Sequence, residues 1–323
     1  MKVHYSYNKK NFTLSVILLI IIIMGLISSN AYSQAQFEAL AYPYEMKVAK
    51  LSDNKSMAYA DLGEGEPILF IHGLASYAPA WKYNIKDLSK SYRCIVVDLI
   101  GYGKSSKGKY TADMSFHAEH LFELMEKLNI STYHVAGHSM GGQIALKMAI
   151  EQPEKVKSLM LMAPAGIETF TDQERTIFKN STTVENIANV SDEQYRINLS
   201  LNFYEMDEKA EFMYEDRMKI KSDEQFMEYS YVVAEGVIGM LNEPVFDQLG
   251  KIIQPTLICY GKEDRLIPNT YLHKNLNTEL IGEIAAKKIP DSQLEMISKA
   301  GHFVHFDQAE QVNQIMKKFL ENN

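Results

Sequence analysis

Residues 132–150 read TYHVAGHSMGGQIALKMAI, and this stretch carries the clearest structural signal in the chain. An apolar, strand-like run gives way to a helical pattern at Ser139. Glycine is disfavoured in both strands and helices, so Gly137 and Gly141 need a backbone reason, such as a tight turn or the close approach of a neighbouring element. The stretch therefore predicts a serine that is held on a sharp turn between a strand and a helix.

This stretch also matches the pattern Gly-x-Ser-x-Gly over residues 137–141. At a strand-to-helix junction the turn lifts the serine hydroxyl above the end of a sheet. The new helix offers unpaired backbone amides beside the serine, and such amides stabilise a developing oxyanion. The pattern arises by chance in many sequences, but its position at this junction favours Ser139 as a nucleophile.

A serine hydroxyl is a weak nucleophile, so it needs a base and a carboxylate that orients the base. Among the nine histidines we predict His302 as the base, because it follows Gly301 directly after the last strand-like run. His305 is the alternative, but it lacks a preceding glycine. Asp264 follows the strand-like run PTLICYG and is the predicted acid, with the adjacent Glu263 as its alternative.

The stretch FIHGLASYAPAW places His72 and Gly73 at the end of an earlier strand. Backbone amides at such a position can face the nucleophile. We therefore predict that the amides of Leu74 and Met140 form the oxyanion hole, with His72 and Gly73 supporting the turn.

His117 and His120 are spaced like a metal-binding pair on an expected helix, but no third ligand has suitable spacing. We expect both side chains to be exposed, and we expect neither a metal nor a cofactor. Cys94 and Cys259 lie within apolar strand-like runs, so we expect small core residues rather than a disulfide.

Strand-like and helical segments alternate over residues 34–165, which predicts parallel crossovers and an α/β sheet. The runs PILFIHG, YRCIVVDL, YHVAGHS and SLMLMAPA are short and continuously apolar, as expected of strands buried on both faces. The same pattern resumes over residues 246–323, where we expect a helix near residues 271–284.

Residues 166–245 contain no clear strand-like run, and we predict that they form a helical lid between the two parts of the core. Capping-box patterns mark four expected helix starts, at Thr171, Thr182, Ser191 and Ser222. This segment contains 17 acidic and 7 basic residues, which we interpret mainly as solvated helix faces.

The first 33 residues have the order of a secretory signal peptide: three lysines, an apolar run from Phe12 to Ile27, and small residues that end at Ser33. An uncleaved membrane anchor is the alternative, and only in that case would we expect the protein to contact a membrane. The formal net charge of −8 disfavours nucleic acid as a partner. We therefore expect an exported protein, periplasmic or secreted.

Four ordered landmarks give the chain a resemblance to the α/β-hydrolase superfamily over roughly residues 46–322: HGLAS, DLIGYGKSS, GHSMGG, and GKEDRLIP followed by GHFVHFD. The resemblance implies an eight-stranded, mostly parallel sheet with helices on both faces and a helical lid after the sixth strand. It also implies that Ser139, Asp264 and His302 form a catalytic triad. Ile100 in DLIGYGKSS departs slightly from the family pattern. This departure affects the expected shape of that loop and not the expected chemistry.

We predict a serine hydrolase that cleaves small neutral carboxylic esters. Hydrolysis of carbon–carbon bonds in dienoic ring-cleavage products is an alternative, since SMGG and APAG resemble that subfamily. That group tends to have glycine-proline-glycine where this chain has LASYAPA, and tryptophan where it has Phe303. A buried cationic anchor such as Arg175, Arg196 or Arg217 would favour this alternative. A peptidase and a non-catalytic binding protein are further options.

Overall fold

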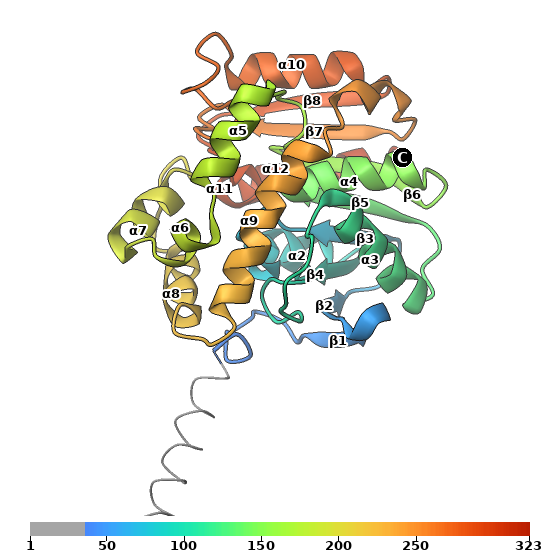
Figure 1. Cartoon of the computed structure of the whole chain (residues 1–323). Coiled ribbons are helices and arrows are strands. Elements are labelled where there is room, and N and C mark those ends of the chain that lie inside the picture. Colours follow the sequence, from blue (N-terminus) through green and yellow to red (C-terminus); the bar gives the residue numbers. More distant parts are fainter. Residues whose placement is uncertain (1–35) are drawn as a thin grey trace, which may run out of the picture.

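An eight-stranded sheet organises the computed structural model, which describes residues 36–323 (Figure 1). The strand order is β1-β2-β4-β3-β5-β6-β7-β8. The β1–β2 and β2–β4 pairs are antiparallel, and all other neighbours are parallel. The predicted eight-stranded, mostly parallel sheet is therefore confirmed. The strands are β1 (Lys47–Lys50), β2 (Ser56–Leu62), β3 (Pro67–Ile71), β4 (Arg93–Val97), β5 (Tyr133–His138), β6 (Val156–Met162), β7 (Thr256–Gly261) and β8 (Ser292–Ile297).

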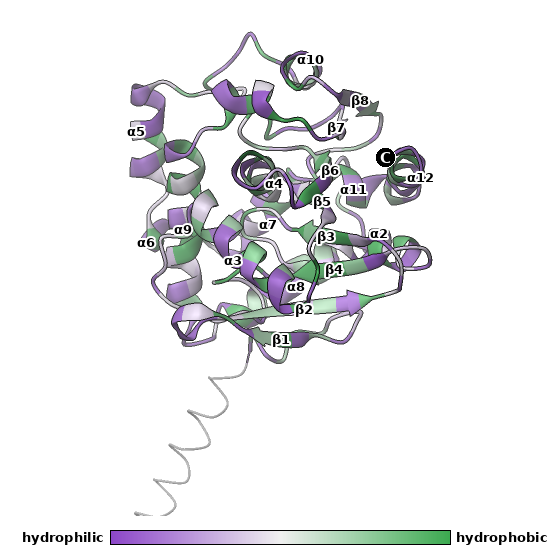
Figure 2. Ribbon diagram, turned by 90° about the vertical axis from the view of Figure 1, so that its right-hand side faces the viewer, coloured by the Kyte–Doolittle hydropathy of each residue, from purple (hydrophilic) through white to green (hydrophobic). Residues whose placement is uncertain are grey.

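Helices cover both faces of the sheet (Figure 2). One face carries α2 (Lys82–Leu88), preceded by the short η2 (Ala78–Trp81), together with α11 (Val304–Asp307) and α12 (Ala309–Leu320). The other carries α3 (Met114–Lys127), α4 (Met140–Glu151) and α10 (Thr278–Lys288). Each face has its own hydrophobic core.

The apolar runs in the sequence explain why these strands are central. All six residues of β5 and all six of β7 are buried, because helices pack against both of their faces. Cys94 in β4 and Cys259 in β7 are free, buried thiols, as the sequence predicts. On the β1 side the chain turns through η1 (Ser52–Asn54), where Asp53 and Asn54 have positive φ angles.

Between β6 and β7 the chain leaves the sheet, and we call residues 166–245 the helical insertion. Its polypeptide contains helices and no strand. The buried Phe203 and Met213 of the insertion belong to one hydrophobic cluster with Phe303 and Phe306, which both follow His302 in the sequence. The insertion therefore contacts the loop that carries the predicted base. Its helices are α5 (Asp172–Ser181), α6 (Val184–Ala188), α7 (Asp192–Ser200), α8 (Glu211–Ile220) and α9 (Phe226–Asn242), and η3 (Phe246–Lys251) follows them.

The helix starts of the insertion agree only partly with the predicted capping boxes. Thr171 forms a complete capping box with Glu174, and Ser191 caps α7. The cap of α6 is Thr183 rather than Thr182. Ser222 caps nothing, because α9 begins after Gln225 without a side-chain cap.

The helix predicted near residues 271–284 is also shifted. Residues 266–276 form turns instead, and α10 starts at Thr278. The side chain of Asn277 accepts a hydrogen bond from the Leu280 amide, which satisfies a free donor at the true helix start. The prediction was wrong because it overlooked this cap.

The predicted signal peptide, residues 1–33, lies outside the described residues, so cleavage and export stay predictions. Among residues 36–323, no helix combines the length and the hydropathy needed to cross a membrane.

Candidate active site

Ser139 occupies a strained turn between β5 and α4. Its φ and ψ angles are 53° and −117°, a conformation that non-glycine residues rarely adopt and that recurs at functional sites. A Cβ atom on Gly137 would lie 2.3 Å from the carbonyl oxygen of Gly141, and one on Gly141 would lie 2.4 Å from that of Ile71. The glycines are therefore needed because β3, β5 and α4 approach one another closely around the serine.

The His302 and Asp264 side chains are in direct contact, with Nδ1 and Oδ2 2.9 Å apart. Both are buried, with 5% and 0% of their side-chain surface exposed. The other carboxylate oxygen of Asp264 accepts hydrogen bonds from the amides of Leu266 and Ile267, at 2.8 and 3.1 Å. When Nδ1 donates to the carboxylate, Nε2 of His302 is left as a proton acceptor.

Glu263 and His305, the alternatives for the acid and the base, make other contacts. The Glu263 carboxylate accepts a hydrogen bond from the Ala300 amide at 3.1 Å instead of contacting His302. His305 is fully buried against Trp81, with ring centroids 4.0 Å apart, and neither ring nitrogen has a hydrogen-bond partner. Burial lowers the pKa of His305 to about 3, so its ring is neutral.

Ser139 and His302 border one cavity of about 440 Å³, which we call the first cavity. Among the described residues, no hydrogen bond joins the Ser139 hydroxyl to His302. The structure thus brings the predicted acid and base into contact and places the predicted nucleophile beside the same cavity. The wall of the first cavity is mainly apolar and includes Leu74, Phe170, Val237, Met240, Leu241 and Ile267, but the charged Glu168 and the candidate anchor Arg175 also line it.

The predicted oxyanion donors lie on either side of the serine in the fold. Met140 is the first residue of α4, where backbone amides lack helical acceptors, and Leu74 follows the end of β3. Neither amide has an acceptor among the described residues. A Cβ atom on Gly73 would lie 3.1 Å from the Cβ of Ser139, so the loop after β3 passes directly beside the serine.

His72 holds this loop through both ring nitrogens. Its Nδ1 donates to the Gly73 carbonyl at 2.7 Å, and its Nε2 accepts from the Leu99 amide at 3.0 Å. Burial lowers the pKa of His72, which favours the neutral ring that this arrangement requires. His72 and Gly73 therefore shape the loop.

Two side chains that the sequence analysis did not single out hold the His302 loop. Oδ2 of Asp307 accepts hydrogen bonds from the amides of Gly301, at 2.7 Å, and Tyr204, at 2.8 Å. Burial raises the pKa of Asp307 to about 6. On the other side, Nε2 of His138 donates to the carbonyl of His302 at 3.0 Å. The stretches GHS and GHFVHFD contain both residues, but only the tertiary contacts show what they do.

His117 and His120 on α3 are buried, with 0% and 4% exposure, so the expectation that they are exposed was wrong. Nδ1 of His120 donates to the Phe116 carbonyl at 2.7 Å, whereas neither ring nitrogen of His117 has a partner. Burial lowers the pKa of His117 to about 3. Within residues 36–323 no group of three or more histidine, cysteine or acidic side chains could hold a metal ion.

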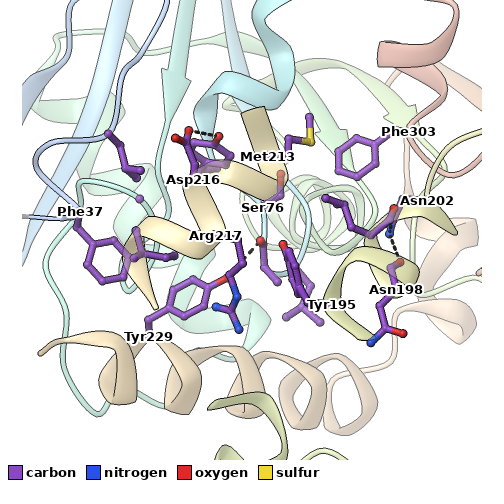
Figure 3. Close-up of a pocket in the computed structure, with 17 residues that line it drawn as sticks. Phe37, Ser76, Tyr195, Asn198, Asn202, Met213, Asp216, Arg217, Tyr229 and Phe303 are labelled. Atoms are coloured by element: carbon purple, nitrogen blue, oxygen red, sulfur yellow. Dashed lines mark hydrogen bonds between the residues drawn. The ribbon is translucent and has the colours of Figure 1, made fainter. Parts of the chain in front are cut away.

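A second cavity of about 210 Å³ adjoins the first, and both are lined by Leu74, Asn202 and Phe303. Arg217 lies in its wall between Tyr195 and Tyr229 (Figure 3).

Arg217 is 6% exposed and forms no ion pair among the described residues, whereas Arg196 pairs with Glu211. Nη2 of Arg217 donates to the Ile187 carbonyl at 3.3 Å, and Nη1 has no partner. Aromatic rings surround the guanidinium, with centroids 4.4 to 5.1 Å away, and they partly offset its charge. These rings belong to Tyr195, Phe226 and Tyr229.

Residues 66–309 match the sequence model of a family described as the alpha/beta hydrolase fold. Lipase 3 of Moraxella sp. (strain TA144) is 31% identical over 281 residues, which cover 83% of this chain and 82% of the lipase. A 2-hydroxymuconate semialdehyde hydrolase of Pseudomonas putida is 28% identical over 266 residues, which cover 80% of this chain and 89% of that enzyme.

A dihydrolipoyllysine-residue acetyltransferase component of an acetoin cleaving system, from Pseudomonas putida, is 29% identical over 264 residues. The match covers 80% of this chain but only 64% of that relative. Among solved structures, a probable hydrolytic enzyme of Pseudomonas aeruginosa PAO1 superposes with a TM-score of 0.80 at 24% identity. This likeness covers 89% of this chain and 97% of that one, and it shows a shared fold.

Proposed function

The chain belongs to the alpha/beta hydrolase fold family and is a hydrolase, and from that premise we propose that it is a serine hydrolase that cleaves carboxylic esters. One arrangement carries the proposal. The strained Ser139 and the His302–Asp264 pair, joined at 2.9 Å, border the same cavity. A nucleophile, a base and an orienting carboxylate are the parts that acyl transfer requires.

In the proposed reaction, the Ser139 oxygen attacks the acyl carbon while Nε2 of His302 accepts the serine proton. The amides of Leu74 and Met140 stabilise the oxyanion of the tetrahedral intermediate. The carbon–oxygen bond of the ester then breaks, and His302 delivers the proton to the departing alcohol. Water repeats the sequence on the acyl-enzyme and releases the acid, while Asp264 holds the imidazole in its working tautomer.

The first cavity supports small neutral esters as substrates. Its mainly apolar wall favours an uncharged acyl or alcohol group, because an apolar group gains free energy on leaving water. The excess of acidic residues in the helical insertion gives a negative potential that disfavours anions. The similarity to a lipase also supports an ester as the substrate.

Arg217 supports a second candidate, which is hydrolysis of a carbon–carbon bond in carboxylated ring-cleavage products. Arg217 lines a cavity that adjoins the first one, and its guanidinium carries a buried nitrogen without an acceptor, a group that favours a carboxylate as its partner. The similarity to a 2-hydroxymuconate semialdehyde hydrolase is consistent with this candidate.

A substrate panel tests the proposal. The purified protein is assayed with p-nitrophenyl esters of increasing acyl length and with a dienoic ring-cleavage product, each alongside the Ser139→Ala variant. Ester turnover that the variant lacks supports the proposal. Turnover of the dienoic compound alone would replace it with the second candidate, and no turnover of either class would contradict both.

A further inference from the structure

The segment 36–40 is clamped onto the helical insertion. The amides of Gln36 and Phe37 both donate to Oδ2 of Asp223, at 2.8 and 3.2 Å. Asp223 is 5% exposed and lies between α8 and α9, where its other oxygen accepts from the Gln225 amide at 2.9 Å. Both oxygens of a buried carboxylate are thus used, and one of them fixes the path of this segment.

Phe37 covers the cation of Lys107, a residue that is only partly buried. The Lys107 amino group lies 4.1 Å from the Phe37 ring centroid and donates to the carbonyls of Gly103 and Ser105, each at 2.6 Å. Burial lowers the pKa of Lys107 to about 8. The Phe37 ring is 3% exposed and packs against Tyr229 of α9, with centroids 5.8 Å apart.

Phe37 and Leu40 line the second cavity but not the first. The residues that the two cavities share include Leu74, which supplies one of the predicted oxyanion donors, and Phe303, which directly follows His302. Figure 3 shows Phe37 and Phe303 on opposite sides of the second cavity. The segment therefore lies at the side of this cavity that is remote from Ser139.

We propose that Phe37 and Leu40 are specificity-determining residues, which form the distal wall of the second cavity and limit the length of the substrate group that extends into it. The proposal rests on the proposed ester hydrolysis and narrows its substrate class to esters with one extended, apolar-tipped group of limited length. An aromatic ring and an aliphatic side chain form a suitable end wall, because a longer group would overlap atoms that the Asp223 clamp and the Lys107 contact hold in place.

The test compares Phe37→Ala and Leu40→Ala with the unchanged full chain in two series of neutral esters. One series lengthens the acyl chain from acetyl to dodecanoyl, and the other lengthens the alcohol. For the unchanged protein we expect kcat/KM to fall beyond a certain length of the acyl or alcohol chain in one of the two series. Each variant should move this length limit to longer chains. Each methylene newly accommodated is expected to raise kcat/KM about fourfold, the equivalent of its burial in an apolar site.

Val48→Ala is the matched control, because Val48 is 57% exposed on β1 and lines neither cavity. It should leave both the length limit and the turnover of the shortest ester unchanged. If the variants turn over esters with the same limits as the unchanged chain, the proposal is overturned. If the unchanged chain hydrolyses no ester, the proposed function fails and this proposal fails with it.

Labelling of Lys107 gives a second readout that needs no substrate. An amine-reactive reagent at about pH 8 should label Lys107 several-fold faster in Phe37→Ala than in the unchanged chain, because the ring that covers the amino group is gone. Peptide mass spectrometry measures the rate, and Val48→Ala should not change it. An equal labelling rate in all three proteins would contradict the described packing of residues 36–40. It would thereby also overturn the proposed distal wall of the second cavity.

Discussion

Nδ1 of His302 lies 2.9 Å from Oδ2 of Asp264, and the two residues are 38 positions apart in the sequence. They meet because the turn after β7 and the loop after β8 reach the same edge of the sheet. Ser139 reaches that edge from β5. The parallel order of these strands is therefore what assembles the candidate site.

Asp264→Asn should lower kcat for ester hydrolysis by roughly 10³- to 10⁴-fold, because an amide favours the wrong tautomer of His302. Glu263→Gln is the matched control, since Glu263 contacts the Ala300 amide and not His302. Steady-state kinetics on one p-nitrophenyl ester measures both variants. If Glu263→Gln loses activity and Asp264→Asn keeps it, the assignment of the acid is wrong.

Gly141→Ala should destabilise the fold by about 1–3 kcal/mol or more, because its Cβ would lie 2.4 Å from the Ile71 carbonyl oxygen. Backbone atoms of a central strand cannot move away cheaply. Gly250→Ala is the control, because the nearest atom to its Cβ is 3.9 Å away, and we expect a change within about 0.5 kcal/mol. Urea denaturation measures the free energies of unfolding. Equal values for the two variants would contradict the close packing of β3, β5 and α4 around the Ser139 turn.

Asp307→Asn should change the pH dependence of stability. Burial raises the pKa of Asp307 from its usual value of 3.8 to about 6. Between these pH values the folded protein holds a proton that the unfolded chain has lost, so ionisation of Asp307 costs stability as pH rises towards 6. Asparagine cannot ionise and avoids this cost.

The Tm of Asp307→Asn relative to the unchanged protein should therefore be higher at about pH 7.5 than at about pH 4.5. Thermal unfolding followed by circular dichroism measures the difference. Glu310→Gln is the control, because the exposed Glu310 lies nearby in the sequence and makes neither of the hydrogen bonds of Asp307. A Tm difference that is independent of pH would show that Asp307 does not titrate as described.

A neutral ester should be hydrolysed with a higher kcat/KM than a matched ester with a free carboxylate, and added salt should narrow the gap. The acidic residues of the helical insertion are the reason. A preference for the carboxylated ester at low salt, lost in Arg217→Met, would reverse this prediction and support the second candidate function.

Much of the sheet and of the turn at Ser139 could be predicted from local patterns. The continuous apolar runs of β5 and β7, and the glycines around Ser139, report on their surroundings directly, because burial on both faces and close backbone contact restrict residue type. The choice of Asp264 and His302 used the same logic, since each follows a strand-like run and a turn.

Other features depend on contacts between distant residues, which no local pattern contains. His117 reads as an exposed helix residue until the packing around α3 is known. Asp307 bonds Tyr204, about a hundred residues earlier, and the isolation of Arg217 becomes visible only when its aromatic neighbours are assembled. The true start of α10 was missed for a different reason, because the prediction overlooked the local cap at Asn277.

The rate of p-nitrophenyl ester hydrolysis by Ser139→Ala shows whether Ser139 is the nucleophile of an ester hydrolase. The side chain is partly exposed and makes no hydrogen bond among the described residues, so the variant should keep the Tm of the unchanged protein. We predict that its kcat falls by at least about 10³-fold, since loss of a triad member removes most of the rate enhancement. A folded Ser139→Ala protein that retains a rate within about tenfold of the unchanged protein would contradict the account.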